Sequence, residues 1–227
     1  MLTDEQMKRI SELLKKGNDV VLKMVKDKIT IVEQGHKVEN RFCPKAKTKA
    51  CVRCKPYCNI TSGFSGAGAF SDGKLSLNRD VVGDFPTLVG EEFAQELIDY
   101  TDKIYLEFGA DTHVEGAEET EEIREIRKSA TIAGLKLVDC PIRHLGTEKA
   151  HQLYYDIEQY LINHGVTLLA DHNCSDIIIE NGECKGAVVN GKNIYSDVTI
   201  VATGRKGADW LDEMCRVHGI GREAGVV

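Results

Sequence analysis

The chain has 227 residues, 42% of them hydrophobic and 29% charged, a composition typical of a soluble globular protein with one or two domains. Its net charge of −7 argues against nucleic acid as the main partner, because a phosphate backbone requires a basic surface. No apolar run approaches the roughly 20 residues that span a bilayer, and the beginning of the chain lacks the apolar centre of a signal peptide. We therefore expect a cytoplasmic protein with no membrane partner; the oligomeric state stays open.

The first third of the chain predicts a helix followed by extended segments. Apolar residues recur at helical spacing over 3–16, and two short apolar runs follow at 20–25 and 29–32. The second run leads directly into Glu33 and then Gly35. An acid at the end of a parallel strand often holds the ribose hydroxyls of a nucleotide, although many strands simply end in Glu.

Residues 59–77 form a glycine-rich loop that contains Gly63, Gly66, Gly68 and Gly73. Glycine loses the most backbone freedom on folding, so its repetition indicates that the backbone must approach another group closely. A phosphate or a flat cofactor ring, met by bare N–H groups, is the chemistry that such a loop favours. The alternative is a flexible surface loop, and the apolar residues within the stretch argue against it.

Charge is distributed unevenly along the chain. Between Arg41 and Ser71 there are six basic residues and no acids, whereas thirteen acids and two basic residues lie between Glu91 and Glu125. A basic segment beside the glycine loop suits a small anion such as pyrophosphate. An unevenly charged, solvated surface is the alternative interpretation.

The basic segment also contains four of the eight cysteines, namely Cys43, Cys51, Cys54 and Cys58. In a cytosolic chain we expect thiols, metal ligands or redox groups rather than structural disulfides. Four thiolates could hold zinc or an iron–sulfur cluster, and Cys51 with Cys54 could form a redox pair. Zinc ligands usually come as two well-separated pairs, so free thiols and no metal are predicted here.

Helices are predicted over 88–108, 118–133 and 147–163, with a short strand at 135–138 and another at 166–169. The second helix begins with acids and continues with bases, as the helix dipole favours.

The last part of the chain predicts strands and a closing helix. Asn-Gly pairs separate three apolar segments near 174–180, 183–189 and 192–195, which predicts a three-stranded antiparallel meander. The β-branched run in 197–204 predicts a buried parallel strand, and a helix is expected over 208–217.

Several of these pieces, in this order, resemble one family: ITIVEQG, SGFSGAGAFSDGKL, PIRHLGTEKA, the meander and VTIVATGR. The chain is similar to the bacterial FAD-dependent dehydrogenases called NAD-utilising dehydrogenases, which belong to the two-dinucleotide-fold flavoproteins. The resemblance extends from about Ile29 to Gly219. Its specific part is CVRCKPYCNI…GAGAFSDGKL, whereas the ATG strand is shared by many flavoproteins.

The resemblance implies an α/β fold: a Rossmann-like, FAD/NAD(P)-binding parallel sheet, an antiparallel three-stranded β-meander and a helical insertion. Residues 1–83 and 145–227 would form an incomplete FAD-binding domain, and 84–144 the mainly helical insertion, a candidate part of the substrate region. Family members open with a strand that leads into G-x-G-x-x-G and continue past the segment that ends here. That unit does not precede Glu33, so the chain is expected to be truncated at both ends.

The resemblance also implies the cofactor contacts. Glu33 matches the acid that holds the adenosine ribose of FAD, and 63–73 matches the segment along the pyrophosphate and flavin ring. Thr203 and Gly204 match a turn packed against FAD; Lys74 would reach the flavin pyrimidine edge unless it is a solvated lysine. The candidate cofactor-binding residues are Glu33, Gly63, Gly66, Gly68, Asp72, Gly73, Lys74, Thr203 and Gly204.

The implied activity is FAD-dependent oxidoreduction, with hydride passing between NAD(P)H, flavin and an unknown small-molecule substrate. No catalytic residue is assigned; among the histidines only His144 is a candidate for substrate or flavin contact, and a structural histidine is the alternative. The rival hypothesis is a catalytically incomplete remnant that binds a nucleotide weakly or binds a partner.

Overall fold

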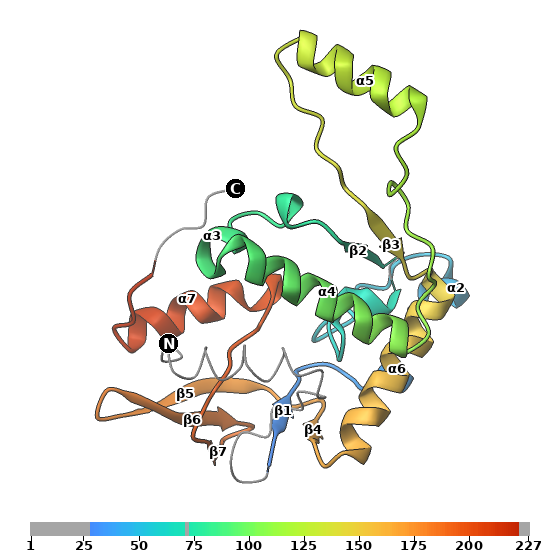
Figure 1. Cartoon of the computed structure of the whole chain (residues 1–227). Coiled ribbons are helices and arrows are strands. Elements are labelled where there is room, and N and C mark those ends of the chain that lie inside the picture. The colour runs from blue at the N-terminus through green and yellow to red at the C-terminus, as the bar shows by residue number, and fades with distance from the viewer. Residues whose placement is uncertain (1–27, 71–72, 223–227) are drawn as a thin grey trace.

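A computed structural model of the chain describes residues 28–70 and 73–222 (Figure 1). The helix predicted over 3–16, the apolar run at 20–25 and Asp72 lie outside the described residues. The described chain forms three small sheets and a set of helices. Within these ranges, no helix combines the length and apolar character needed to cross a bilayer.

The parallel sheet joins two distant parts of the sequence. β1 (Thr30–Val32) pairs in parallel with β4 (Thr167–Leu169). The pairing continues past β1, since the backbone N–H of Glu33 donates to the carbonyl of Leu169 at 3.0 Å. Both strands were predicted and are confirmed, and in the described part of the chain the parallel sheet consists of this pair.

The predicted meander is confirmed at its predicted bounds, with strands β5 (Cys174–Glu180), β6 (Glu183–Val189) and β7 (Lys192–Tyr195). Asn181 and Asn190 adopt φ values of 53° and 47°. Positive φ at this position is what a tight hairpin turn requires, and Asn tolerates it better than most residues.

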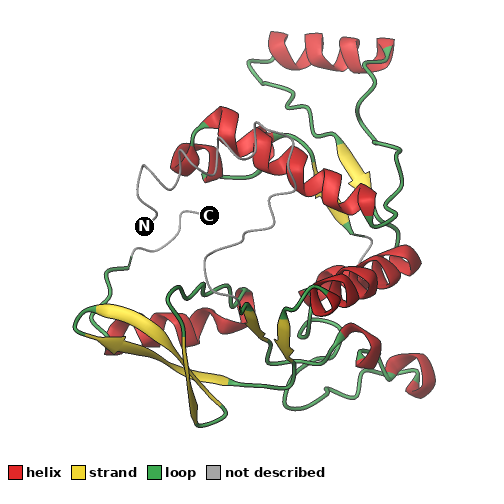
Figure 2. Ribbon diagram, turned by 60° about the horizontal axis from the view of Figure 1, so that its bottom comes forward, coloured by secondary structure: helices red, strands yellow, loops and turns green. Residues whose placement is uncertain are grey.

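Helix α7 (Ala208–Val217) lies beside the meander in Figures 1 and 2. The indole N–H of Trp210 donates to the carbonyl of Ser175 at 3.3 Å, and His218 pairs with Asp176 at 2.7 Å. The helix and the meander therefore form one packed unit.

The buried parallel strand predicted over 197–204 is wrong. The chain runs from β7 to α7 without pairing as a strand, and Ile200 is 85% exposed. A strand of this kind needs a neighbour for its backbone groups, and the described parallel strands β1 and β4 pair with each other. The strand predicted at 135–138 is also wrong, because none of the described strands pairs with it.

The hydrophobic core lies between helices α4 (Glu91–Glu107) and α6 (Thr147–Asn163). The hydroxyls of Tyr105 and Tyr154 join the two helices at 2.8 Å. Helix α6 has its predicted bounds, whereas the helix predicted over 88–108 is split at Gly90, whose φ is +92°. The core cluster comprises Ala110, Leu145, Ala150 and Leu153, with Tyr105, Phe108, Tyr154 and Ile157 packed against it.

Within the predicted insertion, helix α4 packs in the core and helix α5 (Glu121–Ile132) lies outside it. Helix α5 projects away from the other elements in both views and has no buried residue, so its predicted apolar stripe is not part of the core (Figures 1 and 2). The chain leaves and returns beside the antiparallel pair β2 (Lys74–Ser76) and β3 (Ile142–His144). An isolated bridge between Glu115 and Ile142 continues that pairing.

Short helices complete the described chain. They are η1 (Val38–Asn40), α2 (Lys45–Thr48), η2 (Gly66–Phe70), η3 (Arg79–Val81), α3 (Phe85–Val89) and η4 (Arg205–Gly207).

Candidate functional site

The carboxyl end of β1 meets the start of the glycine loop through two glycines. A Cβ at Gly35 would lie 2.4 Å from the backbone nitrogen of Gly63, so only glycine permits this approach. The N–H of Gly35 donates to Oε1 of Glu33 at 2.7 Å. This hydrogen bond fixes the carboxylate of the candidate ribose-binding residue at the strand end.

Arg41 organises the glycine loop from inside. Its side chain is buried, and it donates to the carbonyls of Asn59 at 2.9 Å, Phe64 at 2.5 Å and Gly66 at 2.6 Å. Its guanidinium also lies 4.9 Å from the centre of the Phe70 ring. Sequence reasoning counted Arg41 only as part of a basic segment and did not identify this role.

The backbone N–H groups of the glycine loop are partly used within the protein. Those of Phe64, Gly66 and Gly68 donate to the carbonyls of His36, Gly63 and Ser65 at 3.1, 2.8 and 3.1 Å. At these three positions the N–H groups expected to meet a phosphate are therefore already bonded.

The glycines of the loop have two kinds of surroundings. A Cβ at Gly63 would meet the side chain of Arg41 at 2.6 Å, and Cβ atoms at Gly68 and Gly73 would meet Tyr154 and Leu145 at 2.7 and 2.9 Å. A Cβ at Gly66 would have no atom within 4 Å, and its φ is +56°. Close contacts with other protein atoms thus account for Gly63, Gly68 and Gly73, whereas Gly66 has open space where a Cβ would be, although its N–H and carbonyl are bonded within the protein.

The turn at 203–207 contacts the cysteine-rich segment through the side chain of Lys206. Gly204 has a φ of +61° and, like Gly66, open space where a Cβ would be. Thr203 is exposed and packs closely against Gly207. A Cβ added at Gly207 would lie 2.3 Å from the Cβ of Thr203. The ammonium of Lys206 lies 5.1 Å from the centre of the Tyr57 ring.

Tyr57 connects that turn to the segment that follows β1. Its buried ring packs edge-on against His36 at 5.4 Å, and its hydroxyl donates to Asp171 at 2.7 Å. Burial, together with the hydrogen bond to Asp171, raises the pKa of Tyr57 to about 12. Gly35 and Gly63 thus bring Glu33 and the start of the glycine loop together, and the 203–207 turn is connected to them through Lys206, Tyr57 and His36. Lys74 is exposed at the start of β2.

Glu158 is a functional candidate that sequence reasoning missed. Its side chain is fully buried on α6; Oε2 accepts a 2.9 Å hydrogen bond from the N–H of Val38, and Oε1 has no partner within the described residues. Burial raises the pKa of this carboxyl. The available signal was an acid inside the apolar stripe of the predicted helix, next to Ile157.

His144 and Arg143 are held by acids from neighbouring segments. His144 pairs with Glu115 at 2.6 Å, and the buried Arg143 donates to Asp102 through Nη2 at 2.7 Å and to the carbonyl of Asp111 at 2.6 Å. The pair with Asp102 raises the pKa of Arg143. These contacts join β3 to the start of the insertion and to α4.

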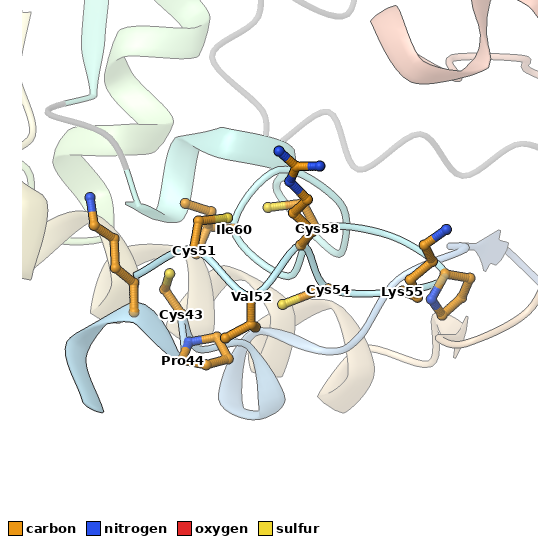
Figure 3. A pocket seen from close by; sticks show the side chains of 11 residues that line it. Cys43, Pro44, Cys51, Val52, Cys54, Lys55, Cys58 and Ile60 are labelled. Carbon is orange, nitrogen blue, oxygen red and sulfur yellow. The ribbon is translucent and has the colours of Figure 1, made fainter. Parts of the chain in front are cut away.

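The four clustered cysteines line one surface pocket of about 490 Å³ (Figure 3). None of the chain's cysteines is in a disulfide. Among the described residues, no three Cys, His, Asp or Glu side chains are grouped so as to hold a metal ion.

No protein-family model and no curated protein matches the sequence. Among solved structures, the chain is similar to a glycine oxidase from Bacillus cereus ATCC 14579, with 13% identity and a TM-score of 0.41 over 91% of this chain and 54% of that chain. It is also similar to an L-proline dehydrogenase from P. horikoshii, with 16% identity and a TM-score of 0.33 over 94% of this chain and 53% of that one. The chain spans about half the length of these structures.

Proposed function

We propose that the protein binds FAD and is an FAD-dependent oxidoreductase, a dehydrogenase that passes hydride between NAD(P)H, flavin and a small organic substrate. One observation carries the proposal: an acid at the end of a parallel strand lies beside a glycine loop, and a second glycine turn reaches the same region through a lysine side chain. The links are the contact of Gly35 with Gly63 and the position of Lys206 over Tyr57. An acid at the carboxyl end of a parallel strand is the group that holds the ribose in dinucleotide-binding sheets.

The residues present fit such a cofactor at three points. The carboxylate of Glu33, fixed by the N–H of Gly35, would accept hydrogen bonds from ribose hydroxyls. A Cβ at Gly66 or Gly204 would face open space, so a pyrophosphate or ring could approach the chain closely there, and at Gly66 the N–H is already bonded to Gly63. The exposed Lys74 would lie near the flavin and favour its anionic reduced form. Bound FAD would supply the hydride-accepting ring; the protein supplies binding and orientation.

Titration of the purified protein with FAD tests the binding step. We expect quenching of flavin fluorescence and a rise in melting temperature with FAD concentration, because a ligand that binds only the folded state stabilises it. Glu33→Gln removes the charge that receives the ribose and should weaken FAD binding about tenfold, or about 1.4 kcal/mol. The control is Glu39→Gln, an exposed acid nearby, which should bind FAD as the wild type does.

The reaction is tested by adding NADH or NADPH to the FAD-loaded protein without oxygen. Bleaching of the yellow flavin would support the dehydrogenase. A colourless protein whose melting temperature does not respond to FAD would contradict the proposal.

A second candidate is a module that binds a nucleotide weakly, or a partner, without catalysis. It is favoured by the internal hydrogen bonds of the N–H groups of Phe64, Gly66 and Gly68, which leave fewer donors for a phosphate. Weak FAD binding without bleaching by either nicotinamide donor would support this candidate over the first.

A further inference from the structure

A second site lies on the segment before the glycine loop. The pocket there is lined by Cys43, Cys51, Cys54 and Cys58, and Figure 3 shows their side chains around the same hollow. Its remaining walls include Val52, Pro56 and Ile60 together with the basic residues Lys45, Arg53 and Lys55. Among the residues that the structure describes, no acid contributes to the lining.

Cys58 has the surroundings of a nucleophilic thiol. It opens a tight turn in which its carbonyl accepts hydrogen bonds from the N–H groups of Thr61 at 3.0 Å and Ser62 at 2.9 Å. The backbone N–H of Ile60, the side chain of Thr61 and the charge of Arg41 lower the pKa of the Cys58 thiol. Because the residue is also exposed, its thiolate can reach a molecule in solution.

Cys51 and Cys54 supply a second thiol in the same pocket. Cys51 is exposed and Cys54 is half-buried, and both precede Cys58 by a few residues on an irregular segment. An irregular segment between the cysteines lets two of them approach without breaking a helix or strand. An exposed, low-pKa thiol that shares a pocket with further thiols has the groups that thiol–disulfide exchange requires.

The charge around the pocket selects its substrate. The three basic side chains of its lining are part of the 41–71 segment, which holds six basic residues and no acids. An anionic molecule is therefore attracted to the pocket, although the chain as a whole is acidic.

We propose that this pocket is a thiol–disulfide exchange site for small anionic disulfides. The Cys58 thiolate attacks one sulfur of RS–SR, forms a mixed disulfide Cys58–SR and releases RS⁻. The thiolate of Cys51 or Cys54, having lost its proton to water, attacks Sγ of Cys58; the internal disulfide forms and the second RS⁻ leaves. Two protein thiols are oxidised and one disulfide is reduced to two thiols. The site does not depend on FAD.

The test uses the reduced, EDTA-treated full chain and dithiobis(nitrobenzoate), a dianionic disulfide whose released thionitrobenzoate is coloured. We expect a fast phase that releases two thionitrobenzoate ions per protein, and peptide mapping should find Cys58 joined to Cys51 or Cys54. Cys58→Ser should slow the fast phase at least about tenfold. Cys140→Ser, which removes an exposed cysteine outside the pocket, should leave it unchanged.

Two further measurements distinguish disulfide exchange by two thiols from the reaction of a single exposed thiol. Replacing the mapped partner by Ser should keep the fast attack but leave a stable mixed disulfide with one ion released. Raising the salt concentration should slow the wild-type fast phase, because it screens the basic residues, and should affect the neutral hydroxyethyl disulfide much less. Each variant is first shown to unfold at the wild-type urea concentration. A fast phase that survives in Cys58→Ser, or a wild type that stops at the mixed disulfide, would overturn the proposal.

Discussion

The Nη2 group of Arg41 donates a 2.6 Å hydrogen bond to the carbonyl of Gly66, so the loop closes around a buried cation. The same guanidinium binds the carbonyls of Asn59 and Phe64. A planar fork of donors suits this task, because a loop of small residues has many carbonyls and few side chains to satisfy them. Arg41 therefore shapes the loop on which the proposed cofactor site depends.

Arg41→Leu should lower the free energy of unfolding by about 3 kcal/mol, since it leaves several buried carbonyls without a donor. Urea unfolding followed by the fluorescence of Trp210, the single tryptophan, measures the loss. Arg53→Leu, an exposed arginine of the same basic segment, should change stability by no more than about 0.5 kcal/mol. Equal losses in the two variants would show that Arg41 does not hold the loop.

Gly35→Ala should destabilise the protein by about 2 kcal/mol or more, because the new Cβ would overlap the backbone of Gly63 and neither chain can yield without moving β1. It should also weaken FAD binding, since it separates Glu33 from the loop. The matched control is Gly221→Ala, where a Cβ meets no atom within 4 Å. Wild-type melting and FAD binding in Gly35→Ala would contradict this account of the close approach.

Glu158→Gln should remove a pH dependence of stability. Burial raises the pKa of Glu158 in the folded protein, so its contribution is fully present below its unfolded pKa and is lost as pH rises through the folded value. Urea unfolding from about pH 4 to about pH 8 should show wild-type stability declining relative to Glu158→Gln. Glu125→Gln, an exposed acid on the projecting helix α5, should follow the wild type. A constant difference between wild type and Glu158→Gln across this range would rule out titration of Glu158.

Asp102→Asn should cost about 3 kcal/mol, because it leaves the buried Arg143 without its charged partner. The double variant Asp102→Leu with Arg143→Met should be more stable than Asp102→Asn, since it buries no unpaired charge. Thermal and urea unfolding measure both. Lys103→Gln, which removes an exposed pair with Glu107, serves as the control and should cost less than about 0.5 kcal/mol. If Asp102→Asn costs no more than the control, the buried pair does not stabilise the fold.

The predictions from the sequence were most accurate for elements whose bounds are determined by local interactions. The meander and α6 have their predicted bounds because Asn-Gly turns and helical periodicity act over a few residues. The strand at 197–204 was wrong because burial of a β-branched run depends on a neighbour that the run itself does not encode.

Two polar residues of the candidate site escaped prediction for a related reason. Arg41 and Glu158 carry charges that are usually solvated, and their burial depends on packing between segments far apart in the chain. The sequence pattern did indicate that Glu33 and the glycine loop belong together, but not that Arg41, Tyr154 and Leu145 occupy the space beside the glycines.

The narrow attachment of α5 has a consequence for how this chain can change over generations. The arm, residues 116–141, leaves the body at Glu115 and rejoins it at Ile142, which pair with each other. Its helix α5 has no buried residue. Lengthening, shortening or exchanging residues 117–138 should leave the folded body intact, because the carbonyls of Asp139 and Pro141 keep their bonds to Asn78 and Leu77. Excision of 117–138 and its replacement by a short glycine turn would show this. The arm is thus the place where descendants of this fold can acquire or discard a domain without rebuilding the rest.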